Sequence, residues 1–509
     1  MPAEGVPAQR SLLAPAWTHG RIAAVAFVAA LLIYVANSAS SPPSETDSAP
    51  NAFLPASVLG DGDLAFSPFE APFMFVWSAK GASGENVRVY VTDWTKNPPG
   101  STKSYIEHYQ EGRLNFVEPA YFLIPTVRER PGTGEPLFVG VFGPVAGLAA
   151  VPLVALGRLS GLFPESDSGT LWALARLTAA LLVAGSVALL YLTAAGFVSR
   201  QRALLLTAAY GTGTCVWVIS SQSLWQQTPE IFFLCLGMFC LVRLPAPWLR
   251  GVAAGLALSL AAACRPTATV VLAAVGMGLL LSDRRCFAAF ALACLPAIAA
   301  MLAYNAYYFG SPFDFGQLAA GARVAQFKTG SPDLWQTPLW LGAAGLLVSP
   351  SRGLLIYSPF LAAAFAGAVL AWKDPRYRPL RVLTLAVPAL WIPAFLWFDW
   401  WGGWSYGYRP IVDTVPLLVL LCAPALEWIL TRPAWRAAFG VLLVWSVLVQ
   451  GLGAFAYSPR GWNAKVIDSA GTLADVDQRA YRDRLWSFGD WQIGYLFAHF
   501  SEARLQRKG

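Results

Sequence analysis

Apolar runs separated by short polar segments follow one another along most of the chain. Runs of about 14–25 residues without polar breaks predict helices that cross or enter a lipid bilayer. The predicted helices cover residues 21–39, 137–157, 170–198, 203–219, 230–243, 251–264, 267–282, 286–308, 338–349, 354–372, 380–399, 411–430 and 436–456. We therefore expect an all-α polytopic membrane protein with about 11–13 transmembrane or half-membrane helices.

Basic residues between the apolar runs predict which loops face the cytoplasm. The basic clusters are Arg10 with Arg21, Arg200 with Arg202, Arg243 with Arg250, Arg284 with Arg285, Lys373 to Arg381, and Arg432 with Arg436. They place the N-terminal tail 1–20 inside, followed by a transmembrane domain over 21–456. Residues 40–136, 220–229, 309–353 and 400–410 and the tail 457–509 are then outside. The first run, 21–39, lacks a clear cleavage site and is interpreted as a permanent helix and not a signal peptide.

One segment conflicts with this topology. Two full crossings between 137 and 198 would put Arg200 and Arg202 outside, against the charge rule. Pro144 and Pro152 interrupt 137–157. Either this segment is re-entrant, which we prefer, or the charge rule fails there.

The first outer loop, 40–136, is too long for a simple connector. It opens with a polar linker over Ser41–Asp47, and the stretch Asp63–Trp77 then combines many aromatic residues with a few acids. We expect that stretch to lie flat at the membrane interface, in a loop that bears interfacial helices. Val87–Thr92 alternates with period two and predicts a short strand.

Composition agrees with a membrane protein. Of the 509 residues, 56% are hydrophobic and 13% charged, and the mean hydropathy is +0.50, whereas soluble domains carry about 25% charged residues. The net charge of +7 comes from the loop clusters, so we expect no nucleic-acid partner. The seven cysteines fall in or beside apolar runs and the three histidines lie far apart, so we expect neither a disulfide framework nor a histidine metal site.

Asp61 and Asp63 form an acidic pair in the first outer loop. Carboxylates held next to hydrocarbon are functional candidates, because they are costly there. A partly desolvated carboxylate can serve as a general base. An aspartate at this place can equally cap a following helix, and the pair alone leaves both interpretations open.

Three further outer segments carry candidate binding residues. Gln222, Trp225 and Gln226 combine amides with an aromatic ring, which suits a sugar, although a plain aromatic belt has the same composition. Arg265 precedes Pro266 at a break between two short helices, where it either contacts an anion such as phosphate or extends to the interface. Arg352, in the Ser349–Gly353 segment, is a second candidate phosphate contact.

The segment Phe398–Pro410 is the densest cluster of such residues. Its three glycines allow tight turns and a close approach to a ligand. Trp404 and Tyr408 offer apolar and hydrogen-bonding surfaces, and Arg409 offers a fixed positive charge. A membrane-interface belt seldom combines these features, so we favour a binding function. Phosphate-binding loops for ATP, dinucleotide-binding loops and serine-hydrolase elbows are absent from the sequence.

Several segments resemble the GT-C superfamily, integral-membrane glycosyltransferases that use lipid-linked sugar donors. They resemble more narrowly a bacterial glycosyltransferase-39-like group. The segments are Leu54–Asp63, Ser223–Gln226, Phe309–Phe313, Trp400–Arg409 and Arg484–Asp490. Gly134–Leu137 departs from the Lys-Pro-Pro-Leu-type motif of the better-known members, which puts a donor-phosphate contact there in doubt.

The resemblance implies an inverting transfer of a sugar from a polyprenyl-phosphate donor to a glycan, lipid or protein acceptor. It implies that Asp61 or Asp63 is the general base and that Arg409 and Arg265 hold the donor phosphate. Gln222, Trp225, Gln226 and Tyr408 would line the sugar or lipid path. It also implies a bacterial cytoplasmic (inner) membrane protein with an extracytoplasmic active site.

Other functions remain open at this point. A transporter would carry ionisable residues in mid-helix, where this chain has mainly Arg176. A lipid-linked glycan polymerase or ligase would use arginines and histidines, and an inactive GT-C-like scaffold would need neither. The sequence leaves open whether a divalent metal ion bridges a carboxylate and the donor phosphate.

Overall fold

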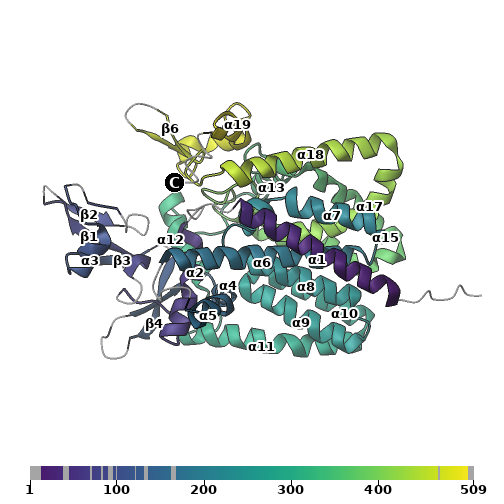
Figure 1. The fold of residues 1–509 in the computed structure, drawn as a ribbon, viewed down its shortest axis with the longest axis horizontal. Coiled ribbons are helices and arrows are strands. Elements are labelled where there is room, and N and C mark those ends of the chain that lie inside the picture. Colours follow the sequence, from purple (N-terminus) through teal and green to yellow (C-terminus); the bar gives the residue numbers. More distant parts are fainter. Residues whose placement is uncertain are drawn as a thin grey trace, which may run out of the picture.

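A computed structural model describes residues 13–37, 45–68, 72–81, 84–89, 96–98, 100–120, 122–130, 134, 136–161, 168–467 and 471–501. Its helices run side by side in one bundle, and most of the long loops gather at one end, on the left of Figure 1. Seven helical segments in the described residues are long and apolar enough to cross a membrane: Thr18–Ala36, Gly169–Ala194, Pro247–Cys264, Arg284–Phe309, Pro375–Leu396, Arg409–Thr431 and Pro433–Ala456. The predicted helical polytopic architecture is confirmed.

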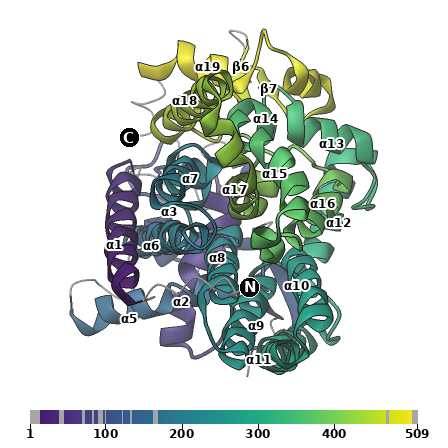
Figure 2. The same ribbon diagram turned by 90° about the vertical axis from the view of Figure 1, so that its right-hand side faces the viewer.

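The observed helices follow the predicted apolar runs closely. The bundle consists of α1 (Leu13–Ala36), α6 (Ser168–Ala194), α7 (Arg200–Thr212), α8 (Gln227–Arg243), α9 (Pro247–Cys264), α10 (Thr269–Ser282), α11 (Arg284–Phe309), α13 (Leu339–Val348), α14 (Leu354–Tyr357), α15 (Ala363–Lys373), α16 (Leu383–Leu396), α17 (Val415–Thr431) and α18 (Pro433–Ala456). Helix α9 packs between α8 and α11, and α15 packs against α17. Seen along the bundle in Figure 2, α1 lies on the flank beside α6.

The segment 137–157 does not form one crossing. It contains strand β5 (Pro136–Gly140) and two short helices, α4 (Val145–Leu148) and α5 (Val151–Leu159). Pro144 directly precedes α4, and Pro152 lies in the first turn of α5, positions that proline tolerates. A helix of nine residues spans about 14 Å, half of the hydrocarbon core. The segment is thus too short to cross the membrane as one helix, whereas its re-entrant course and the side on which Arg200 lies stay predictions.

The first outer loop contains both helices and strands. Helix α2 (Glu45–Gly60) follows α1, and a three-stranded sheet has the order β2-β1-β3, formed by β1 (Phe75–Lys80), β2 (Asn86–Val89) and β3 (Asn115–Pro119). Helix α3 (Tyr105–Gln110) packs on this sheet through the Trp77–Tyr109 ring contact. Strand β4 (Leu123–Glu129) pairs with β5. The short strand predicted near Val87 is confirmed as β2.

Two predictions for this loop are wrong. Glu45–Asp47 begins helix α2 and is not linker; residues 41–44 lie outside the described residues. The aromatic stretch does not lie flat at an interface at its end, because Phe75 and Trp77 belong to β1 and are 1% and 4% exposed. Their rings belong to a second buried core that the loop shares with α5 and α6, which gives them a better apolar environment than headgroups do.

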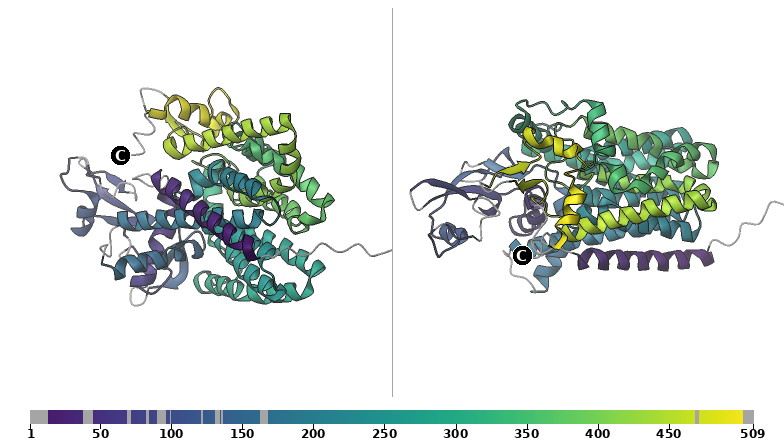
Figure 3. Two further views of the ribbon diagram at one scale, coloured as in Figure 1. Left: turned by 45° about the vertical axis from the view of Figure 1, so that its right-hand side comes forward. Right: turned by 90° about the horizontal axis from the view of Figure 1, so that it is seen from above.

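The C-terminal segment returns to the loop end of the bundle. It consists of β6 (Ala464–Val466), β7 (Leu473–Asp475), the 3₁₀ segment η8 (Arg479–Trp486) and α19 (Gln492–Ala498). Figure 3 shows these elements at the same end as the strands of the first outer loop, away from the start of α1. Helix α12 (Gly316–Thr329), in the second long outer loop, also lies there.

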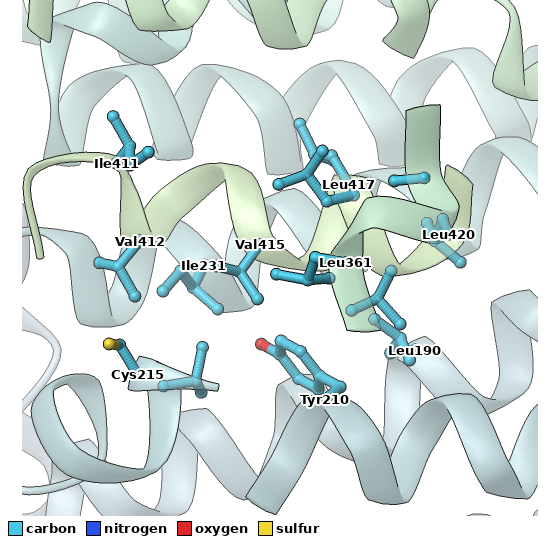
Figure 4. Packing of buried hydrophobic residues seen from close by; sticks show 14 of the residues in the cluster. Leu190, Tyr210, Cys215, Ile231, Leu361, Ile411, Val412, Val415, Leu417 and Leu420 are labelled. Carbon is cyan, nitrogen blue, oxygen red and sulfur yellow. The ribbon is translucent and has the colours of Figure 1, made fainter. Parts of the chain in front are cut away.

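One large apolar core joins the helices. Figure 4 shows part of it, where Tyr210, Leu361, Leu417 and Leu420 meet between the helices. All seven cysteines are buried and unpaired, in line with the expectation that the sequence holds no disulfide framework. Helices approach most closely at small residues, as bilayer packing favours.

Gly367 gives the sharpest test of this packing. A Cβ added there would lie 1.7 Å from the carbonyl oxygen of Leu421, so α15 and α17 would have to separate. We expect Gly367→Ala to lower the free energy of unfolding by about 1–3 kcal/mol. Gly440→Ala is the matched control, since a Cβ there meets nothing within 4 Å and a helical glycine-to-alanine change is favourable by about 1 kcal/mol. Thermal unfolding in detergent compares the two, and equal stability of both variants would contradict the packing.

Candidate active site

The glycine-rich loop predicted to bind a ligand lies at the loop end of the bundle, between α16 and α17. Gly402, Gly403 and Gly407 all have positive φ angles, of 71°, 62° and 51°, a conformation that residues with a Cβ rarely adopt. The predicted need for glycine is confirmed at these turns. They fold the loop back on itself and direct its aromatic residues to both sides.

Arg352 anchors this loop through hydrogen bonds to its backbone. Its side chain is fully buried, with Nε donating to the Trp401 carbonyl at 2.8 Å and Nη2 to the Gly403 carbonyl at 3.0 Å. Nη2 also donates to Asn463 Oδ1 at 2.7 Å, and Nη1 donates to the Ser351 carbonyl. These acceptors occupy the guanidinium. The predicted phosphate contact by Arg352 is therefore wrong, and the residue instead ties the loop to the C-terminal segment.

A second ion cluster fastens the outer side of the loop. Lys328 at the end of α12 lies 2.5 Å from Asp399 Oδ2 and 2.9 Å from Asp477 Oδ1. Burial lowers the pKa of Lys328, but the two carboxylates outweigh it and raise the pKa above its usual value. Burial and the neighbouring Asp399 raise the pKa of Asp477. The cluster thus joins α12, the loop and the C-terminal segment through a charged lysine.

Tyr408 and Gln222 are buried in the frame of the site. The Tyr408 hydroxyl accepts from the Cys215 amide at 3.1 Å and pairs with the Ser358 hydroxyl at 2.7 Å. The Gln222 amide donates to the carbonyl of Tyr34 and to the side chains of Asn37 and Ser221. Both residues are at most 1% exposed. These hydrogen bonds hold both side chains in the interior, and their predicted contact with a sugar or lipid stays a prediction.

Arg409 faces a different environment from Arg352. Its Nη2 lies 3.1 Å from Asp47 Oδ2, and its guanidinium lies over the ring of Trp225 at 4.5 Å from the ring centroid. The side chains of Arg409 and Asp47 are 18% and 22% exposed to solvent. An arginine stacked on an aromatic ring is fixed in direction while its charge remains available. Trp225 and Arg409, which the sequence predicts as separate binding residues, are in contact in the structure.

A small cavity, partly open to solvent, adjoins this pair. Four segments line it: the π-helical turn η3 (Val216–Ser220), the outer loop 220–229, the glycine-rich loop Phe398–Pro410 and the end of α18. The lining residues are Val218, Ile219, Trp225, Trp404, Ser405, Arg409 and Tyr457. Trp404 donates from Nε1 to Asp475 Oδ1 at 2.8 Å, which holds the ring. The structure thus brings three of the predicted binding residues, Trp225, Trp404 and Arg409, to one cavity.

The first turn of helix α2 positions Asp47 next to Arg409. Ser48 and Ser223 pair through their hydroxyls at 2.8 Å, and the Asn51 amide donates to the Leu224 carbonyl at 2.8 Å. All of these groups are buried. The first two turns of α2 are therefore clamped to the loop that carries Trp225, and the position of Asp47 follows from this clamp.

Asp61 and Asp63 lie elsewhere. They form the turn that ends α2, about 20 Å along the helix from Asp47. Asp61 is exposed. Asp63 Oδ1 accepts from the Ser57 hydroxyl at 2.8 Å and from the Ala65 amide at 3.0 Å. Asp63 thus shapes a turn and caps no following helix. The catalytic role of the pair stays a prediction, and the structure does not bring the pair to Arg409.

Arg265 and Gln226 lie on the inner side of the site. Arg265 is extended between α9 and the 3₁₀ turn before α10, and it pairs with Asp413 in the 3₁₀ segment η7 (Arg409–Thr414). Its Nη2 donates to the carbonyl of Pro410, next to Arg409, at 3.1 Å. Gln226 is 6% exposed, and its Oε1 has no hydrogen-bond partner among the described residues. A phosphate contact by Arg265 stays a prediction.

Asp47 is the residue that sequence reasoning missed. It stands in what was interpreted as a polar linker, and it lies 362 positions from its partner Arg409. Its signal is its place as an acid just after the first helix, on the same side as the other outer loops. Within the described residues no three His, Cys, Asp or Glu side chains gather as metal ligands. A divalent metal ion at this site stays a prediction.

Arg352→Ala tests the frame of the site. The change removes a buried donor from the carbonyls of Ser351, Trp401 and Gly403 and leaves Asn463 Oδ1 without one, which we expect to lower the free energy of unfolding by more than about 3 kcal/mol. Arg378→Ala, at an exposed arginine, is the control and should stay within about 0.5 kcal/mol. Thermal unfolding in detergent measures both. An Arg352→Ala protein as stable as the control would show that the loop does not depend on Arg352.

Comparisons with known proteins give matches among solved structures. No family model and no curated protein matches the sequence. An oligosaccharyltransferase from Archaeoglobus fulgidus, tethered to an acceptor peptide with the NVT sequon, has 12% identity and a TM-score of 0.48 over 88% of this chain and 56% of that chain. The oligosaccharyltransferase AglB from the same organism, in complex with an inhibitory peptide and a dolichol-phosphate, has 13% identity and a TM-score of 0.46 over 87% and 55%.

A third structure, of the A. fulgidus oligosaccharyltransferase with Zn and sulfate, has 14% identity and a TM-score of 0.47 over 86% and 54%. This chain thus spans little more than half the length of the matched chains.

Proposed function

We propose that the protein is a membrane glycosyltransferase that moves a sugar from a polyprenyl-phosphate donor to a hydroxyl acceptor on a glycan, lipid or protein. One observation carries this proposal: Asp47, Arg409 and Trp225 lie together beside a cavity at the end of an apolar bundle. A lipid donor needs an apolar path and a cation at its outer end. A hydroxyl acceptor needs a base, and a sugar ring stacks well on tryptophan.

Arg409 is the proposed contact for the donor phosphate. A guanidinium fork matches two phosphate oxygens and keeps its charge at any physiological pH. Negative charge grows on the phosphate as the glycosidic bond breaks, so a fixed cation stabilises the transition state more than the ground state. Arg265 donates to the residue next to Arg409 and is the second proposed contact.

Asp47 is the proposed general base. Its carboxylate is paired with Arg409, 3.1 Å away. A donor phosphate that binds Arg409 takes over this partner, and a carboxylate that loses a cation becomes more basic. Donor binding thus prepares Asp47 to accept the proton of the acceptor hydroxyl. The hydroxyl oxygen then displaces the lipid phosphate in line, and the configuration at the sugar carbon inverts.

The charge pattern of the loops supports a location for this reaction. Basic clusters lie between helices at the end opposite to the site, and cytoplasmic loops carry such clusters. The proposed setting is a bacterial cytoplasmic membrane, with the N-terminus inside and Asp47 and Arg409 at the extracytoplasmic face.

Asp47→Asn tests the base. We expect a loss of about 10²–10⁴-fold in kcat, while the affinity for polyprenyl phosphate does not weaken, because the variant removes a competitor for Arg409. The assay incubates purified protein with a panel of polyprenyl-phosphate sugars. Asp61→Asn and Asp63→Asn, in the same loop, are the comparison variants and should keep their activity within about threefold. If they lose activity and Asp47→Asn keeps it, the base is at the other end of α2.

Arg409→Ala tests the phosphate contact. Removal of a charge-assisted hydrogen-bond donor is worth about 1.5–3 kcal/mol, which is roughly a 10- to 150-fold increase in Kd for polyprenyl phosphate. Arg409→Lys keeps the positive charge but loses the two-pronged guanidinium. Its Kd should lie between those of the wild type and Arg409→Ala. Binding of the lipid phosphate to protein in nanodiscs measures the effect. Unchanged affinity in both variants would remove Arg409 from the donor site.

A further inference from the structure

A second cluster of charged residues lies deeper than Asp47 and Arg409. Glu230 stands in the first turn of α8, Arg265 at the break after α9, and Asp413 in η7. Arg265 Nη1 donates to Asp413 Oδ2. Asp413 follows Arg409 by four positions in the same short segment, so the cluster adjoins the candidate active site on its inner side.

The cluster carries unequal charge if both acids are ionised. Glu230 is 0% exposed and Asp413 is 3% exposed, while the Arg265 side chain retains 12%. Helix α8, which carries Glu230, packs against η7, which carries Asp413, and against α9, which ends at Cys264 just before Arg265. Two carboxylates would therefore face one guanidinium. An uncompensated buried charge costs several kcal/mol, so a further positive charge belongs in the cluster.

The contacts of Glu230 indicate what that charge is. Neither carboxyl oxygen of Glu230 receives a hydrogen bond from an N–H or O–H donor among the described residues. Glu230 shares its buried surroundings with the carboxyl of Asp413. Two ionised carboxylates there repel each other, whereas a carboxylic acid can donate to a carboxylate. One proton supplies both the missing hydrogen and the missing charge.

Arg265 can exchange partners from this position. Its Nε has no hydrogen-bond partner among the described residues. Ala263 and Pro266, which lie near Arg265 in the chain on either side, line a second small cavity. A phosphate that reaches the guanidinium would compete with Asp413 for it. Asp413 would then lose its cation while still buried, which favours its neutral form.

We propose that Glu230 and Asp413 share one proton in the resting protein, and that they take up a second proton from solvent when a phosphate group displaces Asp413 from Arg265. The second half rests on the proposed function, which supplies the phosphate. The cluster is neutral in both states. At rest one proton balances the second carboxylate, and in the complex two protons balance both carboxylates while Arg265 balances a singly charged phosphodiester.

Infrared spectroscopy tests the resting proton without any ligand. We expect the wild-type protein at neutral pH to show the C=O band of a buried carboxylic acid, shifted in D₂O, and we expect Glu230→Gln to lack it. The glutamine amide imitates the protonated acid and still donates to Asp413, so this variant should fold. A wild-type spectrum without the band, or the same band in Glu230→Gln, would overturn the proposal.

Binding of a phosphodiester tests the second proton. The probe is farnesyl methyl phosphate, whose single charge does not change with pH over the neutral range. Because binding takes up a proton, wild-type affinity should rise as the pH falls, by up to about tenfold per pH unit. Calorimetry in buffers of different ionisation heat should show uptake of about one proton, and the acid band should grow on binding.

The variants assign the uptake. E230Q and D413N each keep one acid beside Arg265 and should keep the pH dependence, whereas the E230Q/D413N double variant should lose it. Asp47→Asn controls for the outer pair and should also keep the dependence. If the double variant does not fold, growth of the acid band in E230Q on binding decides the question in its place.

The outcomes separate this inference from the proposed function. A protein that shows the resting band but binds no phosphodiester contradicts the proposed donor class. A protein that binds the phosphodiester with no proton uptake, or with uptake that only Asp47→Asn removes, overturns the proton pair and leaves the proposed function in place.

Discussion

The structure of the site depends on the buried guanidinium of Arg352. A charge without solvent is tolerated only when its hydrogen-bond donors are satisfied, and Arg352 satisfies its donors with carbonyls and a side chain from segments far apart in the sequence. That requirement fixes the glycine-rich loop against the C-terminal segment. Since the same loop carries Trp404 and Arg409, the direction of both side chains toward the cavity follows from a residue that never meets the cavity.

A common physical pattern relates the two arginines that lie closer to the cavities. Each is paired with an aspartate, Arg409 with Asp47 and Arg265 with Asp413. Such pairs keep the charge compensated without a ligand, and they leave a cation that a phosphate can take over. The two pairs differ in burial, because Asp47 retains contact with solvent whereas Asp413 does not. This difference is why the outer aspartate suits proton transfer with an acceptor and the inner one suits proton storage.

Local pattern was sufficient for the helices and for part of the site. The apolar runs marked the bundle, and glycine and arginine marked the loop that carries Arg409. Asp47 and Arg352 were assigned wrongly for one reason, which is that their roles depend on partners 362 and 111 positions away. The polar stretch that contains Asp47 has the composition of a linker. It is helical because α2 is hydrogen-bonded to the outer loop 220–229. The sequence around Arg352 predicts an arginine in an outer loop. In the structure the C-terminal segment covers this side chain. Asp61 and Asp63 were predicted to be catalytic because they form an acidic pair, but two aspartates on either side of Gly62 also form a turn.

The central claim is that a lipid phosphate binds where Asp47, Arg409 and Trp225 meet. A cryo-electron microscopy structure of the protein in nanodiscs with a bound polyprenyl phosphate tests it most directly. The account predicts phosphate density within hydrogen-bonding distance of the Arg409 guanidinium, with Asp47 released from its pair. Phosphate density at the Asp61–Asp63 turn, about 20 Å away along α2, with the Asp47–Arg409 pair intact, would contradict it.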